Sequence, residues 1–119
     1  MRMNRREKGT YYEQKSLHFL EALGYQLCTM NYRTKIGEID LIVMDQETYV
    51  FVEVKSLMAN LDFHPSERVD HKKQKKIRTV AMQYMIDIDQ YEISPMRFDV
   101  ITWEVVQGQE KVQHFINAF

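Results

Sequence analysis

Residues 37–55 read GEIDLIVMDQETYVFVEVK, and they carry the strongest structural signal in the chain. Two mostly apolar runs flank the short polar segment DQET at positions 45–48. Runs of this length, rich in β-branched and aromatic residues and separated by a few polar residues, are typical of a hairpin. The pattern therefore predicts two antiparallel strands, over residues 38–44 and 49–56.

Three charged residues interrupt these apolar strands, namely Asp40, Glu53 and Lys55. Burying a charge among apolar side chains costs several kcal/mol unless a partner, a cleft or a metal ion compensates it. Some feature of the fold must therefore compensate the burial of these three charges, and the geometry of the hairpin suggests which one.

The expected register of the hairpin brings the two carboxylates together. If the turn occupies residues 45–48, Asp40 lies opposite Glu53, and directly opposed residues share one face of a sheet. Glu38 and Lys55 lie two residues away along the same strands, so they point to the same side. The turn lacks the Asn-Gly or Asp-Gly pair that fixes a two-residue loop, and a slip of one residue would send the carboxylates to opposite faces.

In this register, Asp40 and Glu53 supply converging hard oxygen ligands, which suit Mg2+ or Mn2+. A cation bound there would activate water and neutralise charge on a phosphate, and Lys55 would orient that water or stabilise the developing negative charge. An ion pair of Lys55 with either carboxylate explains the same residues equally well, because the spacing D-x(12)-E-x-K is a loose pattern. The pattern of residues leaves both interpretations open.

The remainder of the chain alternates between helical and strand patterns. Apolar spacing and end signals predict two helices, over residues 10–23 and 66–86. They also predict three further strands, over residues 25–32, 96–106 and 112–116. A helix between two strands is the crossover that parallel neighbours require. We therefore expect an α/β fold, with a mixed β-sheet flanked by helices.

Length and composition predict one domain, residues 1–119, in which residues 1–8 form a flexible basic arm. The second helix is expected to follow an irregular stretch that ends at His64-Pro65. The single cysteine, Cys28, can form no internal disulfide and is expected to fill the core. No apolar run approaches the ~20 residues needed to span a bilayer, so we expect no membrane partner and a cytoplasmic location.

Basic residues cluster although the net charge is only −1. Residues 1–8 carry four basic side chains against one acidic, and residues 68–78 carry six against one. Lys73 is the unusual member, because it falls between Val69 and Ile77 on the apolar stripe of the second helix. It is predicted to point at the acidic pocket and a bound phosphate, unless its stem carries the charge out to solvent.

Four other basic residues are candidate contacts to nucleic-acid phosphates: Arg33 and Lys35 before the hairpin, and Lys72 and Lys76 in the second helix. A basic rim beside an acidic pocket suits a phosphodiester. A plain solvated helix face, or pairing of the loop residues with nearby acids, accounts for the same charges.

Glu13 in the first helix has two interpretations. Its spacing to Leu17 and Leu20 would place it on the inner face of the helix, which looks toward the sheet and is also expected to carry Leu23. Alternatively, Thr10 and Glu13 form a capping box at the start of the helix, in which Glu13 bonds back to the backbone.

The segments Gly37-Glu38-Ile39-Asp40-Leu41-Ile42 and Phe51-Val52-Glu53-Val54-Lys55 resemble the signature of the PD-(D/E)XK nuclease superfamily. More narrowly, the chain resembles the YraN-type family of small bacterial proteins, whose fold is similar to that of archaeal Holliday junction resolvases. The resemblance covers nearly the whole chain and includes Gly9, Glu13, Asn31, Arg33, Lys73, Arg78 and residues 97–101 and 117–119.

The resemblance implies a restriction-endonuclease-like αβββαβ core, with Asp40 and Glu53 as metal ligands and Lys55 as the catalytic lysine. Nucleases of this kind often place a glutamate of the first helix at the metal site, which here would be Glu13. It implies an endonuclease that depends on Mg2+ or Mn2+ and hydrolyses phosphodiester bonds in DNA rather than RNA, with branched or damaged DNA as candidate substrates. His64 departs from the family pattern, because related sequences commonly have a glycine before the second helix.

Two other functions fit the same sequence. The first is a nucleic-acid-binding module that keeps the fold and the acidic pocket without catalysis. The second is a dimeric interaction protein, and resolvase-like chemistry on two strands would also favour a homodimer.

Overall fold

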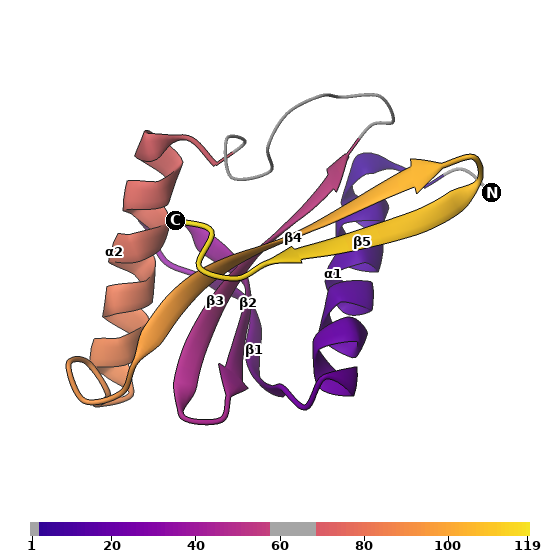
Figure 1. The fold of residues 1–119 in the computed structure, drawn as a ribbon. Coiled ribbons are helices and arrows are strands. Elements are labelled where there is room, and N and C mark those ends of the chain that lie inside the picture. The colour runs from indigo at the N-terminus through magenta and orange to yellow at the C-terminus, as the bar shows by residue number, and fades with distance from the viewer. Residues whose placement is uncertain (1–2, 58–68) are drawn as a thin grey trace.

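The computed structural model describes residues 3–57 and 69–119. Within these two ranges, two helices and five strands follow one another in the predicted order (Figure 1). Their bounds are α1 Arg5–Ala22, β1 Gln26–Arg33, β2 Glu38–Asp45, β3 Thr48–Leu57, α2 His71–Asp87, β4 Met96–Val106 and β5 Gln109–Phe115. No helix in these two described ranges is long and apolar enough to span a membrane.

The five strands form one mixed sheet in the order β1-β2-β3-β4-β5. Strands β3 and β4 are parallel and are connected through α2, whereas the other three neighbouring pairs are antiparallel. This arrangement confirms the expected α/β fold with a mixed sheet and a helical crossover.

The two helices cover opposite faces of the sheet (Figure 1). Phe51 of β3 packs with Ile77 of α2 in one core cluster, whereas its neighbour Val52 packs with Leu20 of α1 in the other. Adjacent residues of a strand point to opposite faces, so the sheet separates two apolar cores.

The register of the β2–β3 hairpin agrees with the sequence prediction. Leu41 pairs with Val52, and Asp45 pairs with Thr48 across a two-residue turn. The turn contains no glycine, and Gln46 adopts the left-handed region at φ 56°.

The first helix begins five residues earlier than predicted. The Asn4 side chain accepts a hydrogen bond from the Glu7 amide at 2.8 Å, which caps the helix, and Arg5 is the first helical residue. Residues 5–8 are therefore helical, so the prediction of a flexible arm is wrong for them; residues 1–2 lie outside the described residues. Thr10 lies inside the helix and donates to the Arg6 carbonyl, which excludes the proposed capping box.

The second helix begins later than predicted. Asp70 caps it by accepting a hydrogen bond from the Lys73 amide at 2.8 Å, and the first helical residue is His71. The predicted start at Ser66 and the irregular stretch at His64-Pro65 lie outside the described residues.

Two burial predictions for the N-terminal third are wrong. Leu23 follows the last turn of α1 and is 58% exposed, and Cys28 is exposed as well. Cys28 lies in β1, which is an edge strand with a register shift between Leu27 and Thr29. An edge strand with a bulge buries fewer of its side chains than a central strand.

The last strand is longer than predicted, because a tight turn joins it to β4. Gln107 and Gly108 both have positive φ, 52° and 77°, as a type I′ hairpin turn requires. Pairing therefore begins at once, with Val106 opposite Gln109.

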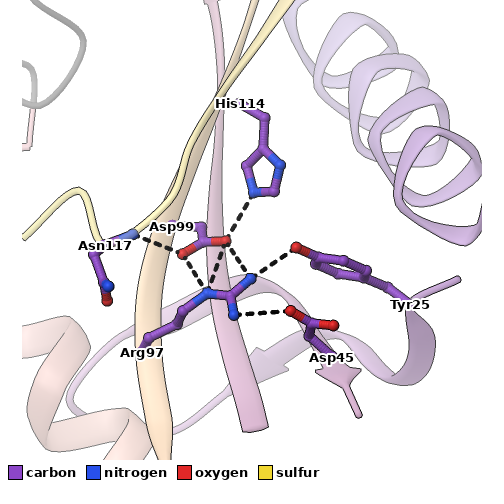
Figure 2. A network of polar contacts seen from close by, with 6 residues as sticks. All are labelled: Tyr25, Asp45, Arg97, Asp99, His114 and Asn117. Atoms are coloured by element: carbon purple, nitrogen blue, oxygen red, sulfur yellow. Dashed lines mark hydrogen bonds and ion pairs between the residues drawn. The ribbon is translucent and has the colours of Figure 1, made fainter. Parts of the chain in front are cut away.

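A polar network centred on Asp99 ties β5 and the C-terminal residues to β4 (Figure 2). Asp99 is 0% exposed, and its carboxylate accepts hydrogen bonds from Arg97 Nε at 3.1 Å and from the Asn117 amide at 3.1 Å. His114 Nε2 lies 2.7 Å from the same carboxylate. Burial works against the charge of Asp99, but the hydrogen bonds from His114 and Arg97 hold its pKa below the ordinary value.

Arg97 extends this network toward the hairpin turn and the start of β1. Its guanidinium donates to Asp45 at 3.0 Å and to the Tyr25 hydroxyl at 2.7 Å (Figure 2). The Asp99 carboxylate and the Arg97 guanidinium are therefore each hydrogen-bonded to several partners, as a buried ion pair requires.

Candidate active site

A pocket of about 580 Å³ opens where the start of β2 and the end of β3 meet the N-terminal halves of both helices. Five acidic side chains line it: Glu13 from α1, Glu38 and Asp40 from β2, Glu53 from β3, and Asp70, which caps α2. The carboxylates predicted to share one face of the hairpin thus lie in one pocket, together with the glutamate from the first helix.

The hairpin positions Asp40 and Glu53 through its backbone. The backbone pairing of β2 with β3 ends at Leu41 and Val52. Next to this pair, the Asp40 carboxylate accepts a hydrogen bond from the Val54 amide at 2.8 Å, so a side chain takes the place of a backbone acceptor. Glu53 is only 4% exposed. Both carboxylates are therefore held by the central strands of the sheet.

Like charges accumulate in the pocket. Burial raises the pKa of Asp40 to about 8, and the neighbouring charges of Glu53 and Glu13 contribute to the increase, while the hydrogen bond from the Val54 amide opposes it. Burial likewise raises the pKa of Glu13, whose carboxyl group is hydrogen-bonded to Asn31 and to Asp40. The pocket is thus a site of unfavourable negative charge that a cation would relieve.

Two lysines contact the glutamate of the pocket. Lys73 Nζ lies 3.0 Å from Glu53 Oε2, and Lys55 Nζ lies 3.8 Å from the same oxygen. The Lys73 side chain reaches into the pocket although it is 43% exposed, as its place on the apolar stripe predicted. The ion pair of Lys55 that the sequence offered as an alternative to chemistry is present, but it is longer than that of Lys73.

The two lysines respond differently to their surroundings. Burial and the neighbouring charge of Lys73 lower the pKa of Lys55. Burial also opposes the charge of Lys73, but Glu53, together with Lys55 and Asp40, more than offsets this effect and raises the pKa of Lys73. Lys73 is therefore the main electrostatic partner of Glu53.

The remaining predicted phosphate contacts divide into two groups. Lys72 and Lys76 line the pocket on the side formed by α2. Arg33 and Lys35 do not line it, and Arg33 Nε donates instead to Glu38 Oε2 at 2.9 Å in an exposed ion pair. For Arg33 the structure thus shows the pairing with a nearby acid that the sequence left open.

The donor set of the pocket fits a hard divalent cation. No group of three or more His, Cys, Asp or Glu side chains in residues 3–57 and 69–119 is arranged to hold a metal ion, so a closed cage of the zinc type is not formed there. Mg2+ and Mn2+ need only one or two carboxylates, because they retain several waters and take oxygen from the substrate. Asp40 and Glu53 match this requirement.

Asn31 is a pocket neighbour whose role sequence reasoning missed. Its side chain bonds to Glu13, but β1 and α1 meet only through tertiary packing. The only sequence signal that pointed to Asn31 was its place in the family pattern.

Comparison with known proteins identifies the family. The family model described as "Uncharacterised protein family UPF0102" matches residues 12–103, a range that includes the hairpin and most of the pocket. A UPF0102 protein of Clostridioides difficile (strain 630) is 42% identical, over 98% of this chain and 100% of the relative. Another, from Alkaliphilus oremlandii (strain OhILAs), is 41% identical over 93% and 96% of the two chains. The chain therefore belongs to the UPF0102 family.

Proposed function

We propose that this protein is a metal-dependent endonuclease of the PD-(D/E)XK type, which hydrolyses phosphodiester bonds in DNA. One observation carries the proposal: Asp40, Glu53 and Lys55 meet in a single pocket, where burial and the neighbouring carboxylates raise the pKa of Asp40 to about 8. Strongly perturbed ionisable groups in a cleft are typical of functional sites.

Each residue of the pocket has a role in this reaction. Asp40 and Glu53 would hold Mg2+ or Mn2+, which lowers the pKa of a bound water and neutralises charge on the phosphate. Lys55 lies beside Glu53 and orients the attacking water or stabilises the negative charge that develops on the phosphate. Glu13 lines the same pocket beside Asp40 and would be a further oxygen ligand for the ion or its waters.

The wall formed by α2 fits a polyanionic substrate. Lys72, Lys73 and Lys76 line the pocket from the first two turns of this helix, beside its N-terminus. Their ammonium groups and the helix dipole both favour phosphate. Duplex DNA and its branched or damaged forms are the substrates to test first.

The decisive test is cleavage by purified variants in Mg2+ and in Mn2+. The substrates are single-stranded, duplex, flap and four-way-junction DNA. We expect Asp40→Asn to reduce cleavage below detection, because it removes a ligand charge, and Lys55→Met to slow it by roughly 10²- to 10⁴-fold. Glu47→Gln, in the turn of the same hairpin, is the matched control and should cleave like wild type. Cleavage at the wild-type rate by both D40N and K55M would refute the assignment of the site.

A second candidate function is a binding module without turnover, which the three lysines on α2 favour. It predicts that the wild type binds DNA but leaves every substrate intact. Binding should weaken linearly with the logarithm of salt concentration, and Lys76→Met should reduce the slope by about one. Cleavage lost in D40N, with binding retained, would instead support the endonuclease.

A further inference from the structure

Asn31 adopts a backbone conformation that is unusual inside a strand. It lies in β1, yet its φ is 52°, in the left-handed region. A side chain with a Cβ atom pays an energetic cost there, and asparagine is among the few residues that tolerate it. A strained residue next to a pocket calls for an account of what its side chain does.

The register places Asn31 beside the carboxylate cluster. The neighbouring pairs are Met30 with Leu41 and Tyr32 with Ile39, so Asn31 lies opposite Asp40. Its side-chain amide acts as a hydrogen-bond donor to the Glu13 carboxyl group, which also contacts the carboxyl group of Asp40; both contacts act to lower the pKa of Glu13. Polar contacts thus run from the edge strand to the helix and back to the centre of the sheet.

Glu13 needs such support, because its neighbours repel it. Glu53 and Glu38 both act on Glu13 as like charges. A carboxylate on a helix that faces other carboxylates would rotate toward solvent unless a donor retained it. The amide of Asn31 is that donor, and an amide can donate without adding a charge to the pocket.

We propose that Asn31 is a positioning residue, which holds the carboxylate of Glu13 against Asp40 at the candidate metal site. The proposal rests on the proposed function for the role of that site. It also gives a reason for the left-handed conformation, because residue 31 must leave the regular path of the strand for its side chain to reach α1.

Metal affinity of the isolated protein tests this role without any need for cleavage. Asn31→Gly removes the amide but accommodates φ 52° without strain, so its urea midpoint should equal or exceed that of wild type. Loss of a residue that orients a metal-site carboxylate typically weakens metal binding about 10- to 100-fold, and we expect a loss of this size for Mn2+ by calorimetry.

A double-mutant cycle shows whether Asn31 acts through Glu13. In the Glu13→Ala background, Asn31→Gly should change Mn2+ affinity no further, since the carboxylate that it positions is absent. An equal loss in both backgrounds would overturn the proposal. Mn2+ binding by N31G as tight as by wild type would overturn it as well, whereas a wild type that binds no Mn2+ would refute the proposed function itself.

A spectroscopic measurement is independent of metal. In 1H-15N spectra, the side-chain amide of Asn31 should move to the position of a solvent-exposed asparagine in Glu13→Ala. It should stay in place in Glu21→Ala, which changes an exposed glutamate of the same helix. An Asn31 amide that is insensitive to Glu13→Ala would overturn the proposal whatever the metal binding.

Discussion

Asp99 and Asp40 lie on strands of the same sheet, but their surroundings are opposite in charge. Asp99 is enclosed by donors from Arg97, His114 and Asn117, and its pKa is held below the ordinary value. Asp40 is buried beside the carboxylates of Glu53 and Glu13, and burial together with their charges raises its pKa to about 8. The first arrangement stabilises the charged carboxylate, whereas the second makes it unfavourable.

The difference separates a structural carboxylate from a candidate catalytic one. A buried carboxylate whose partners are complete contributes to the fold, and removing the charge of Asp99 leaves Arg97 with Asp45 as its remaining carboxylate partner. A carboxylate whose charge is opposed by burial and by like charges gains little stability from that charge, and a bound cation would explain its presence. Substitution of each aspartate by asparagine tests this distinction directly.

The largest effect is expected for Asp99→Asn. Loss of one partner of a buried ion pair costs about 3–5 kcal/mol, because Arg97 keeps its charge in a site that is mostly closed to water. Urea denaturation of the variant and wild type at pH 7 measures this loss. A cost near zero would show that the network contributes little to stability and would remove the contrast with Asp40.

Divalent cations should act on the pocket and leave the network unaffected. At a free Mn2+ concentration of 100 times Kd, the wild type should gain about 2.7 kcal/mol of unfolding free energy. Mn2+ should raise the unfolding free energy of Asp99→Asn by the same amount, although this variant is less stable than wild type without the ion. It should not change the unfolding free energy of Asp40→Asn. A shift in Asp40→Asn equal to that of wild type would place the cation elsewhere.

Without divalent ions, Asp40→Asn should make the protein more stable. An asparagine oxygen can still accept the hydrogen bond from Val54, but it brings no charge next to Glu53. We expect a gain of about 1 kcal/mol or more at pH 8 in EDTA, since one unit of pKa shift corresponds to roughly 1.4 kcal/mol. The gain should shrink at pH 5, where Asp40 of the wild type is protonated in the folded state. A loss of stability comparable to that of Asp99→Asn would contradict the proposed difference between the two sites.

The smallest expected effect is the pH dependence of the stability that Asp99 supplies. The pKa of Asp99 lies below its ordinary value of 3.8, so the folded state binds this proton less readily than the unfolded state. The stability that Asp99 supplies is complete above pH 3.8 and is lost as the pH falls through the lower pKa of the folded state. The difference in unfolding free energy between wild type and Asp99→Asn should therefore narrow on acidification below this value. A difference that stays constant down to pH 2 would contradict the lowered pKa.

The features that were predicted correctly depend on local periodicity. The apolar runs on both sides of residues 45–48 and the expected turn between them placed Asp40 and Glu53 on the same side, and the helical spacing of Lys73 directed it toward them. Strand period and helix period are properties of neighbouring residues, so a single sequence contains them.

The errors and omissions depend on information from distant residues or on competing local signals. Asn4 and Thr10 are both acceptable caps, and the structure uses the earlier one. Cys28 is apolar enough for a core, but its strand is an edge strand, which only the order of the sheet reveals. Asp99 meets His114 through the register of β4 and β5, and no periodicity predicts that pair.

The chain's local patterns determined the order of its helices and strands, the register of the hairpin and the shared face of Asp40, Glu53 and Lys55. Packing decided which elements converge on that face: α1 brings Glu13, α2 brings Lys73, and the edge strand brings Asn31. Packing also decided that the pKa of Asp40 is raised and that of Asp99 is lowered. The pKa of a carboxyl group depends on burial and on the neighbours that the fold brings to it, not on its place in the sequence.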